Sequence, residues 1–256
     1  MSARLLEIEA VSKHFGGLKA LQEVSFGVES GEVVALIGPN GAGKSTLLNI
    51  VNGFLKPTSG RVRVGGRDVT GQAVHRIARL GVGRTFQKIR VFKGLSVLDN
   101  VRMAVRDPLG ASDLLFRSSR IMHLEREATQ RAEYLVDLVG LGERAEDRAV
   151  DLPYGQQRLV EIARALAGSR QLLLLDEPGA GMNDEEMGSL RALINRIRRE
   201  FALTILVVEH NVDFVLQLSD RIVVFDHGVV IASGTPVEVI GDPKVIEAYL
   251  GGKQHV

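Results

Sequence analysis

The sequence predicts an α/β fold with a mostly parallel core sheet, an N-terminal antiparallel β region and a helical subdomain. Apolar runs at residues 33–37, 172–175 and 204–208 have the length and composition of strands buried on both faces of a parallel sheet. Helical patterns alternate with these runs, as in right-handed βαβ crossovers. Polar segments follow all three runs, which predicts a ligand site at the carboxyl edge of the sheet.

The composition narrows the class of protein. The chain has 256 residues, of which 45% are hydrophobic and 25% charged, as in a soluble globular domain. A net charge of +1 gives no overall basic field for nucleic acid. The absence of cysteine excludes disulfides, thiolate metal sites and a thiol nucleophile. Residues 1–7 lack a signal-peptide core and no apolar run approaches roughly 18 residues, so we expect a cytosolic protein that meets membranes through partners.

A phosphate-binding loop follows the first apolar run. Residues 38–46 fit G-x-x-x-x-G-K-[ST] between a predicted strand and a predicted helix, the context that this P-loop motif requires. Its glycines let backbone N–H groups surround phosphate oxygens. We expect Lys44 to reach the β- and γ-phosphates of a nucleotide, and Ser45 to ligate Mg²⁺. The predicted nucleotide-binding residues are Gly38, Pro39, Asn40, Gly41, Ala42, Gly43, Lys44, Ser45 and Thr46.

In the segment before the P-loop, apolar and polar residues alternate as they do in β-strands. Phe15 ends the first of these strands, where an aromatic ring can stack on a nucleotide base or pack in the core. We predict the base contact. Downstream, residues 60–69 are expected to form a hairpin around a Gly65-Gly66 turn, and residues 74–80 a helix.

Residues 88–150 contain no strand-like run and are predicted to form a helical insertion. Ser96 is a candidate N-cap for a helix that reaches Val105. A second helix, rich in Arg and Glu, is expected from about residue 114 to residue 139 and to end at Gly140. The prediction is therefore one domain over residues 1–256, with a helical subdomain that comprises residues 88–150 and the start of the following helix.

Two carboxylates at the end of the second apolar run are candidate catalytic and metal-binding groups. Acids that end a buried strand are best satisfied by a cation, so Asp176 is predicted to hold Mg²⁺ directly or through water. Glu177 is predicted to be the general base that polarises the attacking water. His210 ends the third run and is predicted to bond the γ-phosphate or to orient Glu177. The other histidines, His227 among them, are expected to be structural.

These motifs, in this order, resemble the ATP-binding subunit of an ABC transporter over essentially the whole chain. The resemblance rests on the P-loop, Gln87, a Leu-x-x-Gly-Gln helix start, the Asp-Glu-Pro strand end and His210. It implies that Gln87 meets Mg²⁺ and the attacking water and couples the site to a membrane partner. It also implies a signature loop that contacts ATP bound on the opposite subunit of a head-to-tail dimer. That loop comprises Leu152, Pro153, Tyr154, Gly155 and Gln156.

Within this family the chain resembles the larger ATPase subunit of branched-chain amino-acid importers. The likeness is carried by residues 154–158, 178–183, 208–211 and 234–251. It implies a second ABC ATPase subunit as partner, in a heterodimer or a homodimer, together with two transmembrane permease subunits and, indirectly, an extracytoplasmic solute-binding protein. It also implies a peripheral position on the cytoplasmic face of the plasma (inner) membrane. The implied cargo is a branched-chain or related amino acid or amide.

Two segments depart from the family pattern. Pro153 and Tyr154 stand where the signature usually has Ser and Gly, and proline has neither a backbone N–H nor a hydroxyl. Asn183 stands where the loop after Glu177 usually ends in Asp. Because both changes fall on surfaces expected to complete the partner's site, we predict a heterodimer with two unequal ATP sites.

Two other classes remain as alternatives. A soluble ABC-type ATPase that acts on nucleic acid or the ribosome usually has two ATPase halves or a long arm, whereas this chain has one P-loop and no basic stripe. A P-loop kinase would need an acceptor pocket and a lid, and the signature-like loop and His210 disfavour it. An ATP-hydrolysing importer subunit is therefore the favoured function, and co-purification with membrane proteins would distinguish it from both alternatives.

Overall fold

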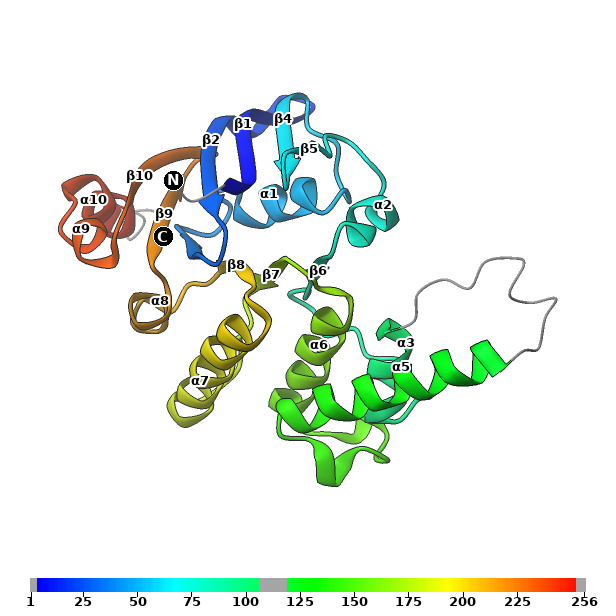
Figure 1. Ribbon diagram of the computed structural model, residues 1–256. Helices are drawn as coiled ribbons and strands as arrows, with labels where there is room; N and C mark the ends of the chain where they lie inside the picture. Colours follow the sequence, from blue (N-terminus) through cyan, green and yellow to red (C-terminus); the bar gives the residue numbers. More distant parts are fainter. Residues whose placement is uncertain (1–3, 106–118, 252–256) are drawn as a thin grey trace. The chain divides into compact units, whose positions relative to one another are not determined.

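The computed structural model describes residues 4–105 and 119–251, which form two compact units (Figure 1). The first unit comprises Met1–Gln87 and Arg170–Val256, and the second comprises Lys88–Ser169. The P-loop and both strand-end acids lie in the first unit, and the signature-like loop lies in the second.

The core of the first unit is a six-stranded sheet with the order β10-β9-β3-β8-β7-β6. The strands β3, β7 and β8 are buried along their whole length, as the apolar runs predict. All pairings are parallel except that of β9 with β10, which confirms the predicted mostly parallel sheet. The strands are β3 (Val33–Ile37), β6 (Val82–Arg84), β7 (Leu172–Asp176), β8 (Thr204–Val208), β9 (Arg221–Asp226) and β10 (Val229–Gly234).

A second, antiparallel sheet has the order β2-β1-β4-β5. Its strands are β1 (Arg4–Phe15), β2 (Leu18–Glu29), β4 (Ser59–Val64) and β5 (Arg67–Asp68). Gly65 and Gly66 have φ of 55° and 73° and form the predicted hairpin turn. Helix α1 (Lys44–Val51) contacts both β2 and β7, so Leu47 and Leu48 join the two sheets in one core.

Side-chain caps mark the start of three further helices of this unit, α7 (Asp184–Phe201), α8 (Val212–Leu218) and α9 (Pro236–Ile240). Asn183 caps α7: its side chain accepts from the Glu186 N–H at 3.0 Å, and Glu186 accepts from the Asn183 N–H at 2.9 Å. Helix α8, which the sequence analysis did not predict, begins at Asn211, whose side chain accepts from the Phe214 N–H at 3.0 Å. The others are α2 (Val74–Arg79) and α10 (Pro243–Gly251).

The second unit is helical in its described residues. Helix α3 (Val97–Val105) packs against α5 (Ser119–Leu138) and α6 (Tyr154–Gly168). Ser96 caps α3 as predicted, with its Oγ accepting from the Asp99 N–H at 3.1 Å. Helix α5 ends just before Gly140 (φ 79°), also as predicted, whereas the predicted start near residue 114 lies outside the described residues. Short 3₁₀ turns at Gly142–Arg144 and Ala149–Asp151 lead into α6.

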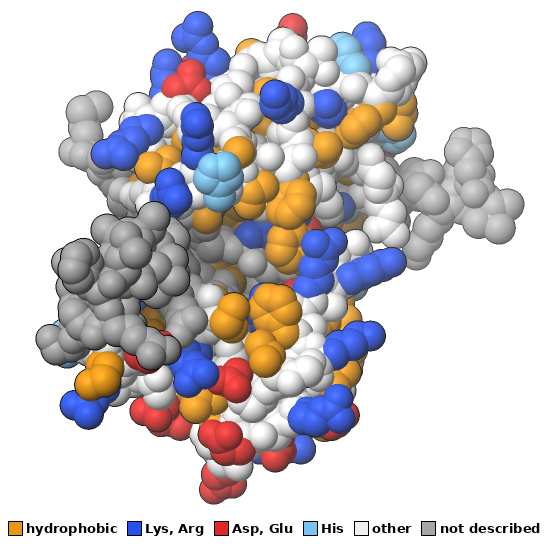
Figure 2. Space-filling model, turned by 90° about the vertical axis from the view of Figure 1, so that its right-hand side faces the viewer, with side chains coloured by type: hydrophobic (Ala, Val, Ile, Leu, Met, Phe, Trp, Pro, Cys, Tyr) orange, Lys and Arg blue, Asp and Glu red, His pale blue; other side chains and the backbone are white. Residues whose placement is uncertain are grey.

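Among residues 4–105 and 119–251, no helix combines the length and apolarity needed to span a bilayer. On the face in Figure 2, Lys and Arg side chains lie among hydrophobic and uncharged ones.

Candidate active site at the phosphate-binding loop

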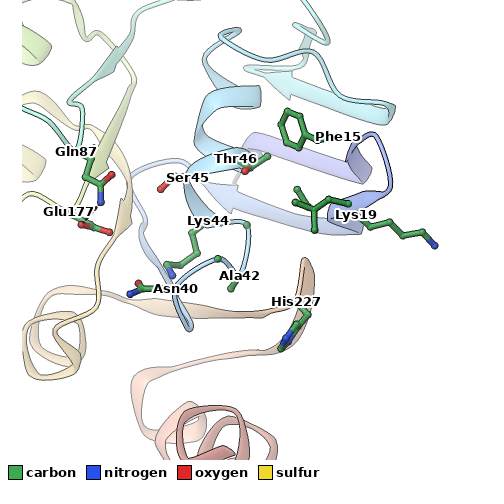
Figure 3. A pocket seen from close by; sticks show the side chains of 14 residues that line it. Phe15, Lys19, Asn40, Ala42, Lys44, Ser45, Thr46, Gln87, Glu177 and His227 are labelled. Atoms are coloured by element: carbon green, nitrogen blue, oxygen red, sulfur yellow. Dashed lines mark hydrogen bonds between the residues drawn. The ribbon is translucent and has the colours of Figure 1, made fainter. Parts of the chain in front are cut away.

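A cavity of about 510 Å³ lies at the P-loop and is lined only by residues of the first unit (Figure 3). Residues 40–46 form one side of it, and the end of β1 with the start of β2 forms another. Gln87, Glu177 and His227 complete the lining. Residues 40–46 of the predicted P-loop, together with Phe15, Gln87 and Glu177, are therefore brought to one cavity.

Two P-loop glycines are required by neighbouring strands rather than by space for a ligand. Gly38 has φ 143°, and a Cβ there would lie 2.0 Å from the Phe225 carbonyl oxygen. Gly43 has φ 101°, and its Cβ would lie 2.6 Å from the Ala20 carbonyl oxygen. Gly41 also has a positive φ of 83°, but a Cβ there would meet no atom within 4 Å. The close approach of β2 and β9 therefore fixes the loop's shape at both ends.

Replacing Gly38 by alanine is expected to destabilise the fold more than the matched change Gly41→Ala. Both substitutions carry the strain of a positive φ, about 1–3 kcal/mol. Only Gly38→Ala adds a clash with backbone, which must move β9 or the loop. Urea unfolding of the two variants measures the difference. Equal losses in the free energy of unfolding would contradict the packing account.

Lys44 is a buried cation held by the loop's own carbonyls. Lys44 is only 8% exposed, and its Nζ donates to the carbonyl oxygens of Gly38 at 2.6 Å and Pro39 at 2.9 Å. Burial lowers the pKa of Lys44, while the charges of Glu177 and Asp176 act in the opposite direction. An ammonium in this position can exchange neutral carbonyl oxygens for the charged oxygens of a phosphate.

Asp176 is the centre of a buried polar cluster. Its Oδ1 accepts from the Ser45 hydroxyl at 3.3 Å, its Oδ2 pairs with Arg84 at 3.1 Å, and its backbone N–H donates to the Thr85 hydroxyl at 3.2 Å. Burial raises the pKa of Asp176, and the guanidinium of Arg84 opposes that shift. Ser45 and Asp176 thus place a hydroxyl and a carboxylate oxygen side by side, the hard donors that Mg²⁺ prefers. These residues fit the metal, whereas no group of three or more His, Asp or Glu residues able to hold one occurs in the described part of the chain.

Removing Arg84 is expected to lower the free energy of unfolding by about 3–5 kcal/mol, because it leaves the buried carboxylate of Asp176 without its cation. Arg196→Ala is the matched control: its pair with Glu200 is largely exposed and is worth about 0.3–0.5 kcal/mol. Chemical denaturation of both variants tests the difference, and a loss for Arg84→Ala as small as the control's would contradict it.

Glu177 and Gln87 form the second polar pair of the cavity. The Gln87 amide Nε2 donates to Glu177 Oε2 at 3.0 Å, and Figure 3 shows the two side chains facing one another. The Glu177 N–H donates to the Val208 carbonyl at 2.9 Å, which ties the end of β7 to β8. Glu177 has φ 48°, a left-handed conformation that a glutamate adopts only when its surroundings impose it. Such strain is common at functional sites.

His210 follows β8 but does not line the cavity. Its side chain is 65% exposed. The neighbouring Glu209 is buried, and its carboxylate accepts from the backbone N–H groups of Gly179 at 2.8 Å and His210 at 3.1 Å. Glu209 therefore fixes the loop after Glu177 to the end of β8. The sequence analysis missed this role, although an acid that ends an apolar strand beside His210 was a visible signal.

The outer end of the cavity carries Phe15 and His227. Phe15 is 46% exposed, so the alternative that it packs in the core is wrong, and Lys13 Nζ lies 5.0 Å from its ring centroid. His227 was expected to be structural, but it lines the cavity with a 92% exposed side chain, and its Nδ1 lies 2.7 Å from Asp226 Oδ1. His227 occupies a positive-φ position (43°) in the tight turn between β9 and β10.

The signature-like loop opens α6 in the helical unit. Pro153 precedes the helix with φ −52° and supplies no side-chain cap. Arg144 Nη1 donates to Gln156 Oε1 at 2.5 Å, and Gln157 Nε2 donates to the Val150 and Leu152 carbonyls at 3.1 and 2.8 Å. Leu152 is buried, whereas the Tyr154 side chain is half exposed. Hydrogen bonds of Gln156 and Gln157, at the start of α6, therefore hold the loop.

Comparison with known proteins gives relatives over nearly the whole chain. The protein is 43% identical over 253 residues to the high-affinity branched-chain amino acid transport ATP-binding protein BraF of Pseudomonas aeruginosa, covering 98% of this chain and 99% of the relative. It is 40% identical over 253 residues, with the same coverage, to the high-affinity branched-chain amino acid transport ATP-binding protein LivG of Escherichia coli.

Solved structures show the same fold. MJ1267, an ATP-binding cassette of an ABC transporter, superimposes with a TM-score of 0.85 and 33% identity, covering 97% of this chain and 99% of that chain. A dimeric post-hydrolysis state of the ATP-binding cassette MJ0796, bound to ADP and Pi, gives 0.76 and 25% over 90% of this chain and 98% of that chain. Residues 229–255 match the family described as branched-chain amino acid ATP-binding cassette transporter, and residues 21–180 match the family described as ABC transporter. With the P-loop cavity and the full-length relatives, these matches show that the chain belongs to the ABC transporter family, as one of its ATP-binding proteins.

Proposed function

We propose that this ABC ATPase hydrolyses ATP to drive the import of branched-chain or related amino acids, or their amides, through separate membrane permeases. The observation that carries the catalytic part is the cavity that joins Lys44 and Ser45 of the P-loop to the Gln87–Glu177 pair. The cargo is supported by the relatives that transport branched-chain amino acids and by the family match over residues 229–255.

Each residue of the cavity has a role in this proposal. Lys44 and the loop N–H groups bind the phosphates, and Phe15 stacks on the base. Glu177 accepts a proton from the attacking water, while Gln87 orients Glu177 and the water.

Around these groups, Ser45, Asp176 and Gln87 would hold Mg²⁺, which supplies positive charge against the β- and γ-phosphate oxygens. His210 reaches the γ-phosphate in this proposal, which requires its exposed side chain to turn toward the cavity.

The proposed assembly is a dimer of ATPase subunits bound to two permeases on the cytoplasmic face of the plasma (inner) membrane, with a solute-binding protein on the far side. The dimeric cassette among the solved relatives supports the pairing. We further propose a heterodimer with unequal ATP sites, because Pro153 gives the α6 start neither a hydroxyl nor an N–H for a partner's phosphate. Asn183 weighs less, because its side chain already caps α7 as an aspartate would. Equal loss of activity on mutating Glu177 and the partner's equivalent acid would contradict unequal sites.

Co-purification and uptake together test the proposed function. The tagged full chain is expected to purify from solubilised membranes with two permeases and a second ATPase, and cells that lack it are expected to lose ATP-dependent uptake of labelled leucine, isoleucine and valine. Complementation with Glu177→Gln should not restore uptake. Purification with ribosomes or nucleic acid, or transfer of the γ-phosphate to a small molecule instead of water, would support one of the two alternative classes.

A further inference from the structure

Two charged residues of α6 bind the segment that follows Gln87, and a third charged residue pairs with one of them. The N–H of Arg90 donates to Glu161 Oε1 at 3.2 Å, and Arg164 Nη1 donates to the Arg90 carbonyl. Arg158 Nη1 pairs with Glu161 Oε2 at 2.8 Å. Both polar groups of a single backbone residue are therefore bound by one helix. We call Arg158, Glu161 and Arg164 the α6 clamp.

A second contact of Arg164 reaches Phe92, two residues after Arg90. The Arg164 guanidinium lies 4.5 Å from the ring centroid of Phe92. Phe92 is also fixed by Asn100 of α3, which accepts from the Phe92 N–H at 2.8 Å and donates to its carbonyl at 3.1 Å. Residues 90–92 are thus held without any secondary structure of their own.

Burying the charged side chains of the clamp costs desolvation free energy, which apolar side chains at the same positions would not cost. The side chains of Arg158 and Glu161 are 0% and 4% exposed. Burial raises the pKa of Glu161, and Arg158 is the largest opposing influence. Apolar side chains of similar volume commonly stabilise a protein core as well as a buried ion pair does. Charged side chains at these positions can, however, form strong hydrogen bonds with the backbone N–H and carbonyl groups of an irregular segment, which apolar side chains cannot.

The clamp connects the segment that follows Gln87 with α6, the helix that the signature-like loop opens. Gln87 is hydrogen-bonded to Glu177, and the chain enters the helical unit at the next residue, Lys88, two positions before Arg90. On α6, Arg158 lies one turn after Tyr154, where the signature-like loop opens the helix. We propose that Glu161, with Arg158 and Arg164, is a positioning residue that makes the segment after Gln87 and the first turn of α6 move as one piece. This inference rests on the proposed ATPase function, in which Gln87 responds to nucleotide.

Hydrogen exchange of the full chain, with and without Mg²⁺ and a non-hydrolysable ATP analogue, tests the clamp. In the wild-type protein, binding of the analogue is expected to change the rate of amide hydrogen exchange in both segment 88–92 and segment 154–161. Glu161→Gln removes the charge that faces Arg158, and Arg164→Ala removes the grip on the Arg90 carbonyl. In both variants we expect the change at 88–92 to persist and the change at 154–161 to fall by about fivefold or more. Analogue affinity should stay near the wild-type value, because neither residue lines the cavity.

Glu133→Ala is the matched control, since it removes an exposed acid from α5 in the same unit and should leave both changes intact. If Glu161→Gln does not fold, Arg164→Ala, at the less buried edge of the clamp, decides the result. A wild-type-sized change at 154–161 in the variants, or none there in the wild type despite bound analogue, would overturn the clamp and leave the ATPase proposal intact. Failure of the wild type to bind the analogue would instead overturn both proposals.

Discussion

Glu177→Gln is expected to lower the rate of ATP hydrolysis by about 10²- to 10⁴-fold while ATP binding stays close to the wild-type affinity. The substitution keeps the shape of the side chain and an oxygen that can accept from Gln87, but it removes the carboxylate that takes the proton of the attacking water. The residues placed to bind phosphate, Lys44 and Ser45, are untouched. Phosphate release from saturating Mg-ATP, measured beside equilibrium binding of a fluorescent ATP analogue, separates the two effects.

Glu185→Gln is the matched control for this experiment. Glu185 is an exposed acid in the first turn of α7, outside the cavity, so its change should leave the rate unaltered. A Glu177→Gln rate within a few-fold of the wild type would show that another group accepts the proton. Loss of binding together with the rate would mean that Glu177 shapes the cavity rather than the reaction.

Lys44→Met is expected to weaken ATP binding by about 10- to 150-fold, since a charged hydrogen bond to phosphate is worth about 1.5–3 kcal/mol. Methionine is close to lysine in length and apolar, so it removes the ammonium without emptying the site. Burial disfavours the charged form of Lys44, which offsets the loss of its hydrogen bonds to the Gly38 and Pro39 carbonyls, so the variant is expected to fold. Weak binding by a fully folded variant is therefore the expected combination.

Lys19→Met tests whether charge anywhere in the cavity would serve as well. Lys19 also lines the cavity, but Figure 3 shows its side chain directed away from the P-loop. Its loss is expected to change affinity much less than the loss of Lys44. Equal effects of the two substitutions, measured by calorimetric titration with Mg-ATP, would contradict a specific contact between Lys44 and the phosphates.

The parts of the fold that the sequence predicts well are those with strong local signals. The buried strands β3, β7 and β8 are continuous apolar runs, and the P-loop is a fixed spacing between a strand and a helix. Ser96 and Gly140 mark helix ends by their own chemistry. In such segments the neighbours along the chain determine the structure.

The parts that were missed depend on residues far apart in the chain. Strand β6 is three residues long and contains Gly83, so it depends on its pairing with β7, which lies far along the chain (Val82 pairs with Leu172). The partnership of Arg84 with Asp176 follows from that pairing and has no local signature. The requirement for glycine at position 38 likewise comes from Phe225 on β9. Periodicity and motif spacing carry no information about such contacts.

The mass of the Glu177→Gln protein in Mg-ATP tests most directly the claim that this chain binds ATP and works as one of two paired ATPase subunits. Without the general base, ATP should persist and trap any nucleotide-dependent dimer. Native mass spectrometry with the second ATPase present is expected to show a dimer in Mg-ATP and monomers in Mg-ADP. If the chain forms this dimer with the second ATPase but does not dimerise with itself, the result would also support unequal sites. Monomers in Mg-ATP under every condition, with the permeases added as well, would contradict the account.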